Sequence, residues 1–155
     1  MLQHIPSIQP LKSYKYVSGF GTRMHPIYKT LRTHTGIDLV APSGTKIYAT
    51  GDGVVRSAQF ERGYGKAVVI DHGYKYQSMY AHCSEILVHE RQKVKRGDVI
   101  ALVGSTGTST GSHLHYEIIK NGQKVNPINY FLNDLSPQEF EEIRLISVQT
   151  NQSFD

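Results

Sequence analysis

Five ligand-type side chains fall into three short motifs whose spacing could hold a metal ion. His34 and Asp38 are four residues apart, His113 and His115 are two apart, and His82 follows Tyr-Ala. In an extended strand, side chains at i and i+2 or i+4 share a face, so each pair converges if its segment is extended. Each motif alone is more often a structural polar pair, but their joint presence in one small domain favours a metal site.

Imidazole and carboxylate ligands suit zinc, and they suit copper(I) or an iron–sulfur cluster poorly. Three such ligands with an open fourth position form the arrangement of a catalytic zinc site. A purely structural zinc site would normally close with a fourth protein ligand. The residues therefore predict a Zn²⁺ cofactor that takes part in catalysis.

These residues must be positioned by strands, because β-branched and aromatic runs alternate with glycine at close intervals from Val17 onward. Asn121-Gly122 is a strong two-residue hairpin signal. The sequence predicts a mainly β, antiparallel domain with strands at Lys46–Ala49, Gly53–Gln59, Lys66–Asp71, Tyr76–His82, Asp98–Val103, His113–Lys120 and Gln123–Asn126.

Two segments show a faint internal repeat. Residues 44–51 match residues 97–104 in the spacing of their glycines and in an isoleucine three residues after the first glycine. The match suggests a sheet built partly by duplication, and coincidence in a glycine-rich chain explains it about as well.

The ends of the chain differ from its middle. Residues 1–16 lack periodicity and are expected to form an irregular arm, and residues 17–132 form the predicted domain. In residues 133–155, Ser136, Pro137 and Glu139 have the pattern of a helix capping box, which predicts a short C-terminal helix followed by a polar tail.

The composition excludes several classes of protein. The chain has 155 residues, 39% hydrophobic and 19% charged, as expected for one globular domain. The net charge of +4 comes without a cluster of basic residues, so no nucleic-acid partner is expected. No membrane span and no export signal are predicted in this chain, and we expect a monomer. Cys83 follows His82 on a predicted strand, where neighbours face opposite sides, so a thiol-protease pair is disfavoured.

Four motifs together resemble the lysostaphin-type, or LytM-type, zinc metallopeptidases. They are SGFGTRMHP at residues 18–26, HTGID at 34–38, MYAH at 79–82 and GTSTGSHLHYE at 107–117. The resemblance runs from Val17 to Phe131 in the family's order and spacing. It implies an antiparallel β-sheet groove of the duplicated hybrid motif type, and cysteine at 83 and serine at 112 are minor departures.

The resemblance implies a role for each residue of the motifs. His34, Asp38 and His115 match the zinc ligands, and His113 and His82 match two unligated histidines that assist catalysis. Tyr28 is either an additional oxyanion donor that binds substrate or a surface tyrosine in a turn.

The implied activity is hydrolysis of peptide cross-links or stem peptides of bacterial peptidoglycan, in the manner of a D,D-endopeptidase, at the cell envelope (periplasmic or secreted). The alternative is a non-catalytic module that binds the cell wall or activates an amidase, against which the five intact residues argue. The bond that is cut stays open among glycine bridges, D-alanine–diaminopimelate cross-links and stem peptides.

Overall fold

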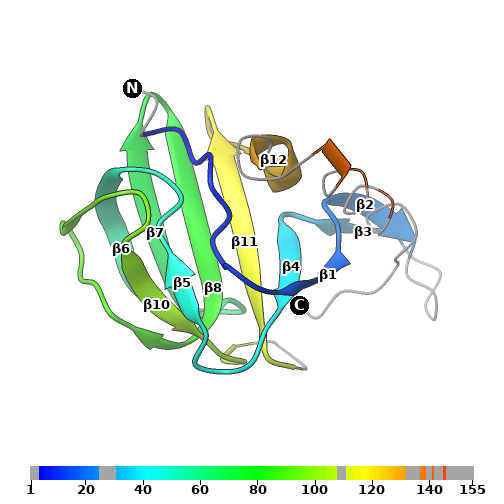
Figure 1. Ribbon diagram of the computed structural model, residues 1–155, viewed down its shortest axis with the longest axis horizontal. Coiled ribbons are helices and arrows are strands. Elements are labelled where there is room, and N and C mark those ends of the chain that lie inside the picture. Colours follow the sequence, from blue (N-terminus) through cyan, green and yellow to red (C-terminus); the bar gives the residue numbers. More distant parts are fainter. Residues whose placement is uncertain are drawn as a thin grey trace.

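The computed structural model describes residues 4–24, 31–107 and 111–131, together with residues 137, 138, 141 and 145. The fold is mainly β, as the sequence predicts (Figure 1). The elements are β1 (Lys15–Ser18), β2 (Gly21–Met24), β3 (Leu31–His34), β4 (Ile37–Val40), β5 (Lys46–Tyr48), β6 (Gly53–Glu61), β7 (Gly65–Gly73), β8 (Tyr76–Ile86), β9 (Lys93–Val94), β10 (Val99–Val103), β11 (His113–Lys120), β12 (Gln123–Val125) and the 3₁₀ helix η2 (Pro127–Tyr130).

The described strands form one large sheet and one small sheet. The ten-stranded sheet runs β1-β4-β11-β8-β7-β6-β9, with β12 paired to β11 and with β10 paired to β8 and β5. Every pairing is antiparallel. The small sheet, β2-β3, lies beside the β1–β4 edge in Figure 1. This order makes β4, β11 and β8 adjacent, so residues on three sequence-distant segments become neighbours.

All seven predicted strands are present, with boundaries shifted by a few residues. The hairpin between β11 and β12 has Asn121 at φ 52° and Gly122 at φ 76°, the left-handed values that a type I′ turn requires. Strands β1 to β4 and β9 are not among the predicted ones, because their residues show too little alternation to be recognised. Since β1 begins at Lys15, strand structure starts two residues before the predicted domain boundary.

The two faces of β11 carry different chemistry. Leu114, Tyr116 and Ile118 belong to the hydrophobic core, and the alternate residues His113 and His115 lie on the opposite face. Both faces are buried along most of the strand. The sheet therefore holds the histidines rigidly, with the core packed directly behind them.

The repeated segments pair with each other as β5 and β10. The turns before them are equivalent: the N–H of Thr45 donates to Pro42 and that of Asp98 donates to Lys95, and Gly44 and Gly97 have φ values of 93° and 92°. This equivalence supports the interpretation of the repeat as a duplication.

The predicted N-terminal arm packs on the sheet, where Leu11 enters the core and the carbonyl of Pro10 accepts from the N–H of Tyr48 at 2.8 Å. Figure 1 shows this dark blue segment crossing the sheet toward β1. Near the C-terminus, residues 137, 138, 141 and 145 are helical, and the remainder of the predicted helix, with Ser136 and Glu139, lies outside the described residues. Within the described residues, every helical segment is too short or too polar to span a lipid bilayer.

Candidate metal centre

The predicted ligands come together where β3, β4 and β11 meet. His34 is the last residue of β3, the chain bends at Gly36, and Asp38 is the second residue of β4. The pair converges across this bend rather than along one strand. In the antiparallel register of β4 and β11, His115 lies opposite Asp38, and His113 is two residues earlier on the same face.

Three donor groups converge as zinc ligands would. The ligand atoms of His34, Asp38 and His115 all lie within 4.8 Å of one another, and all three side chains are buried. His34 Nε2 is 3.3 Å from Asp38 Oδ2, and His115 Nδ1 is 3.1 Å from Asp38 Oδ1. Zinc–ligand bonds of about 2.0–2.1 Å in a tetrahedron place neighbouring ligands about 3.3 Å apart, so this donor set fits Zn²⁺.

The two candidate ligand histidines present different nitrogens. His34 Nδ1 donates to the carbonyl oxygen of Gly19 at 2.7 Å, which leaves Nε2 as the nitrogen beside Asp38. In His115 the arrangement is reversed: Nε2 donates to the carboxylate of Glu117 at 2.8 Å, and Nδ1 lies beside Asp38. The carbonyl oxygen of Gly19 can only accept, so a neutral His34 carries its proton on Nδ1 and its lone pair on Nε2. Both nitrogens of His115 face a carboxylate, Nδ1 that of Asp38 at 3.1 Å and Nε2 that of Glu117 at 2.8 Å. The shorter contact favours the proton on Nε2, with the lone pair of Nδ1 toward the metal position.

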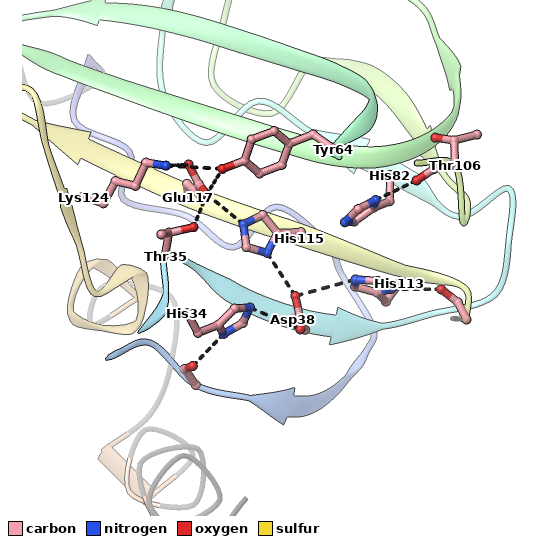
Figure 2. A network of polar contacts seen from close by, with 12 residues as sticks. His34, Thr35, Asp38, Tyr64, His82, Thr106, His113, His115, Glu117 and Lys124 are labelled. Carbon is pink, nitrogen blue, oxygen red and sulfur yellow. Dashed lines mark hydrogen bonds and ion pairs between the residues drawn. The ribbon is translucent and has the colours of Figure 1, made fainter. Parts of the chain in front are cut away.

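His113 and His82 lie next to this group, as Figure 2 shows. Their Nδ1 atoms donate to backbone carbonyl oxygens, that of Gly111 at 2.9 Å and that of Thr106 at 2.6 Å. Their ring centroids are 4.8 Å apart, and His113 Nε2 is 3.6 Å from Asp38 Oδ1, longer than a hydrogen bond. Both rings therefore present Nε2 as the basic nitrogen, at a position suited to proton transfer.

His82 reaches the site through an irregularity in β8. Its φ of 63° is unusual for a residue other than glycine, and its N–H donates to the carbonyl of Tyr64 at 2.8 Å. Tyr80 and Cys83 both belong to the core although they are three residues apart, so the alternation of the strand is reset between them. This break turns His82 toward the histidines of β11 and leaves Cys83 in the core, where burial raises the pKa of its thiol to about 12.

Glu117 is a residue of the site that sequence reasoning missed. Its Oε2 accepts from Thr35 Oγ1 at 2.6 Å and from Tyr64 Oη at 3.1 Å as well as from His115, and Lys124 Nζ is 3.4 Å from Oε1. Burial opposes its ionisation, but the hydrogen bond from His115, the charge of that ring when it is protonated, the hydrogen bond from Thr35 and the charge of Lys124 outweigh burial and lower the pKa of Glu117 to about 2. The signal was available, because residue 117 continues the period of two that begins at His113.

Beside this carboxylate lies a cavity of about 310 Å³. Tyr64, Met79, Glu117 and Lys124 contribute to its lining. Tyr64 also contacts the site through its hydrogen bond to Glu117.

Three other tyrosines lie away from this cavity. Tyr80 is fully buried in the core, Tyr74 is exposed in a turn, and Tyr76 packs edge-on against Tyr130. Tyr28 lies outside the described residues, so its suggested part in substrate binding stays a prediction.

Comparison with known proteins decides the family. Residues 32–127 match the model of peptidase family M23. The chain belongs to this family. The resemblance to lysostaphin-type enzymes is thereby confirmed, and the match spans β3 to the start of η2, which includes His34, Asp38, His82, His113 and His115.

Relatives of this M23 domain include named peptidases. The chain is 49% identical over 126 residues to DD-carboxypeptidase/endopeptidase Mpg of Neisseria meningitidis serogroup B, which covers 81% of this chain and 29% of that protein. A crystal structure of a zinc-containing peptidase from Vibrio cholerae superposes with a TM-score of 0.73 at 40% identity, covering 76% of this chain and 37% of that one. The catalytic domain of lysostaphin from Staphylococcus simulans superposes with a TM-score of 0.67 at 28% identity, covering 76% of this chain and 91% of that one. The chain spans less than a third of the length of curated relatives that it matches.

Proposed function

We propose that this M23 domain is a zinc-dependent peptidoglycan peptidase in which His34, Asp38 and His115 hold the metal. The observation that carries the proposal is the convergence of two imidazole nitrogens and one carboxylate, all buried, at the spacing of zinc ligands. A zinc-containing relative at 40% identity supports the choice of metal. When bound, Zn²⁺ would lower the pKa of a water molecule to about 7 and polarise the scissile carbonyl.

His113 and His82 act on the protons of the reaction. Because Nδ1 of each ring is held by a carbonyl oxygen, Nε2 is the atom that accepts a proton from the attacking water and returns it to the leaving amine. The protonated ring can also donate to the negative charge that develops on the carbonyl oxygen. We assign these roles to the two histidines jointly, since both rings lie beside the ligand group.

The proposed substrate is a peptide cross-link or stem peptide of peptidoglycan, and the proposed location is the cell envelope. The name of the Neisseria relative, a DD-carboxypeptidase/endopeptidase, supports a bond that follows D-alanine. The cavity beside Tyr64 is lined in part by Glu117, which contacts His115, and it offers room for substrate.

Digestion of purified sacculi with the zinc-loaded chain tests this function, with the released fragments identified by mass spectrometry. We expect cross-linked dimers to fall to monomers with free D-alanine ends, and a chelator to stop the reaction. Fragments cut at glycine bridges would contradict the proposed bond. Bound zinc without any peptide release would contradict the enzyme proposal and favour a non-catalytic module that binds the cell wall or activates an amidase.

A further inference from the structure

We propose that Glu117 is the positioning residue of His115, a role that rests on the proposed zinc site. Its carboxylate holds the proton of His115 on Nε2 and thereby turns Nδ1 toward the metal. The proposal stands on the contacts of one buried carboxylate that no step of the reaction uses.

His115 differs from the three other histidines of the site. His34, His82 and His113 each donate from Nδ1 to a backbone carbonyl, so each presents Nε2. His115 donates from Nε2 to a side-chain carboxylate and presents Nδ1. Nδ1 of His115 also lies 3.1 Å from the carboxylate of Asp38, so the shorter contact of Nε2 with Glu117 is what directs the proton away from the metal position.

The surroundings of Glu117 require an acceptor. Oε2 receives the N–H of His115 and the hydroxyl of Thr35, and it also receives the hydroxyl of Tyr64, which itself accepts from Lys124 Nζ at 3.3 Å. Lys124 Nζ faces Oε1. An ionised carboxylate can only accept and satisfies all four donors, whereas an amide of the same shape would turn its NH₂ group toward one of them.

The network also fixes the carboxylate in space. Thr35 adjoins His34, and the carbonyl of Tyr64 holds the backbone of His82, so Glu117 connects the segments that carry the other site residues (Figure 2). A carboxylate behind a ligand histidine orients the ring and raises its basicity, and its loss typically costs about 10–100-fold in metal affinity. We expect that loss here.

The test compares Glu117→Gln with Glu85→Gln, which removes the same charge from an exposed position on β8. The zinc dissociation constant is measured by chelator competition, and the unfolding of the zinc-free chain is measured in urea. We expect zinc to bind about 10–100-fold more weakly to Glu117→Gln and with unchanged affinity to Glu85→Gln. Glu117→Asp keeps the charge on a shorter side chain, so its zinc affinity should lie between those of the two glutamine variants.

Two results would overturn the proposal. One is a Glu117→Gln chain that is less stable without metal yet binds zinc within threefold of the original affinity, because a merely structural carboxylate would behave so. The other is independent of any variant: ¹⁵N NMR of the original chain should show the His115 proton on Nε2, and a proton on Nδ1 contradicts the assignment. If the unsubstituted chain does not bind zinc, that result instead contradicts the proposed function itself.

Discussion

Replacing Gly36 with alanine is expected to loosen the metal site without touching any ligand. Gly36 forms the bend between His34 and Asp38 and lies against β11. A Cβ at this position would lie 2.3 Å from the carbonyl oxygen of Tyr116 and 2.9 Å from Cγ of Glu117. The nearest obstacle is backbone, which cannot rotate away as a flexible side chain can.

The size of the effect follows from these distances. Ordinary contact begins near 3.4 Å, so β4 and β11 must separate locally by about 1 Å. Overpacking of this kind costs about 1–3 kcal/mol, and a clash with backbone belongs at the upper end of that range. Zinc sites tolerate distance errors of about 0.2 Å, so the same shift separates Asp38 from His115 by more than the site can absorb. We expect zinc affinity to fall at least about tenfold.

Urea unfolding of the zinc-free chain and chelator competition measure the two effects. Gly44→Ala is the matched control, because it has a positive φ of 93° but open space around it and lies away from the ligands. Strain at Gly44 should cost about 1 kcal/mol and leave zinc binding unchanged. A Gly36→Ala chain that is as stable as Gly44→Ala and keeps full zinc affinity would refute the reasoning.

Two further predictions concern the core. Thr50→Val removes the hydroxyl that forms a hydrogen bond with Tyr80 Oη at 2.9 Å and accepts one from Tyr116 Oη at 2.8 Å. The free energy of unfolding should fall by about 1–3 kcal/mol, and the zinc affinity should not change. An unchanged urea midpoint would show that the two tyrosine hydroxyls find other partners. Burial raises the pKa of Cys83 from 9.0 to about 12. The contribution of the protonated thiol to the free energy of unfolding is therefore complete below pH 9 and is lost as pH rises through 12. Ellman's reagent at pH 8 should therefore find no reactive thiol in the folded chain and one thiol in guanidinium, and rapid reaction of the folded chain would contradict the burial of Cys83.

The sequence predicts which residues and strands form the site better than it predicts how their side chains are arranged. The period of two in residues 113–117 predicts His113 and His115 on one face of β11. The structure confirms that both side chains lie on the same face. The same period extends to Glu117, but the role of Glu117 depends on its contacts with Thr35 and Tyr64, and no local pattern pairs residues so far apart in the chain.

Two details lay beyond any local pattern. The bend at Gly36 brings His34 to Asp38, although a single extended strand was the expected arrangement. The positive φ of His82 turns this residue into the site, and it reflects how β8 fits against the turn at Tyr64 rather than the preference of histidine. Both are decided by strand register, which long-range pairing sets.

Zinc content and peptide release, measured together on His113→Ala and His115→Ala, test the central claim most directly. The claim is that neighbouring histidines on one strand face divide the work, one holding the metal and the other moving protons. We predict that His113→Ala keeps one zinc per chain and releases no peptide from sacculi, whereas His115→Ala loses the zinc. His113 Nε2 lies only 3.6 Å from Asp38, so the opposite outcome is chemically accessible. Loss of zinc from His113→Ala with retention in His115→Ala would contradict the account.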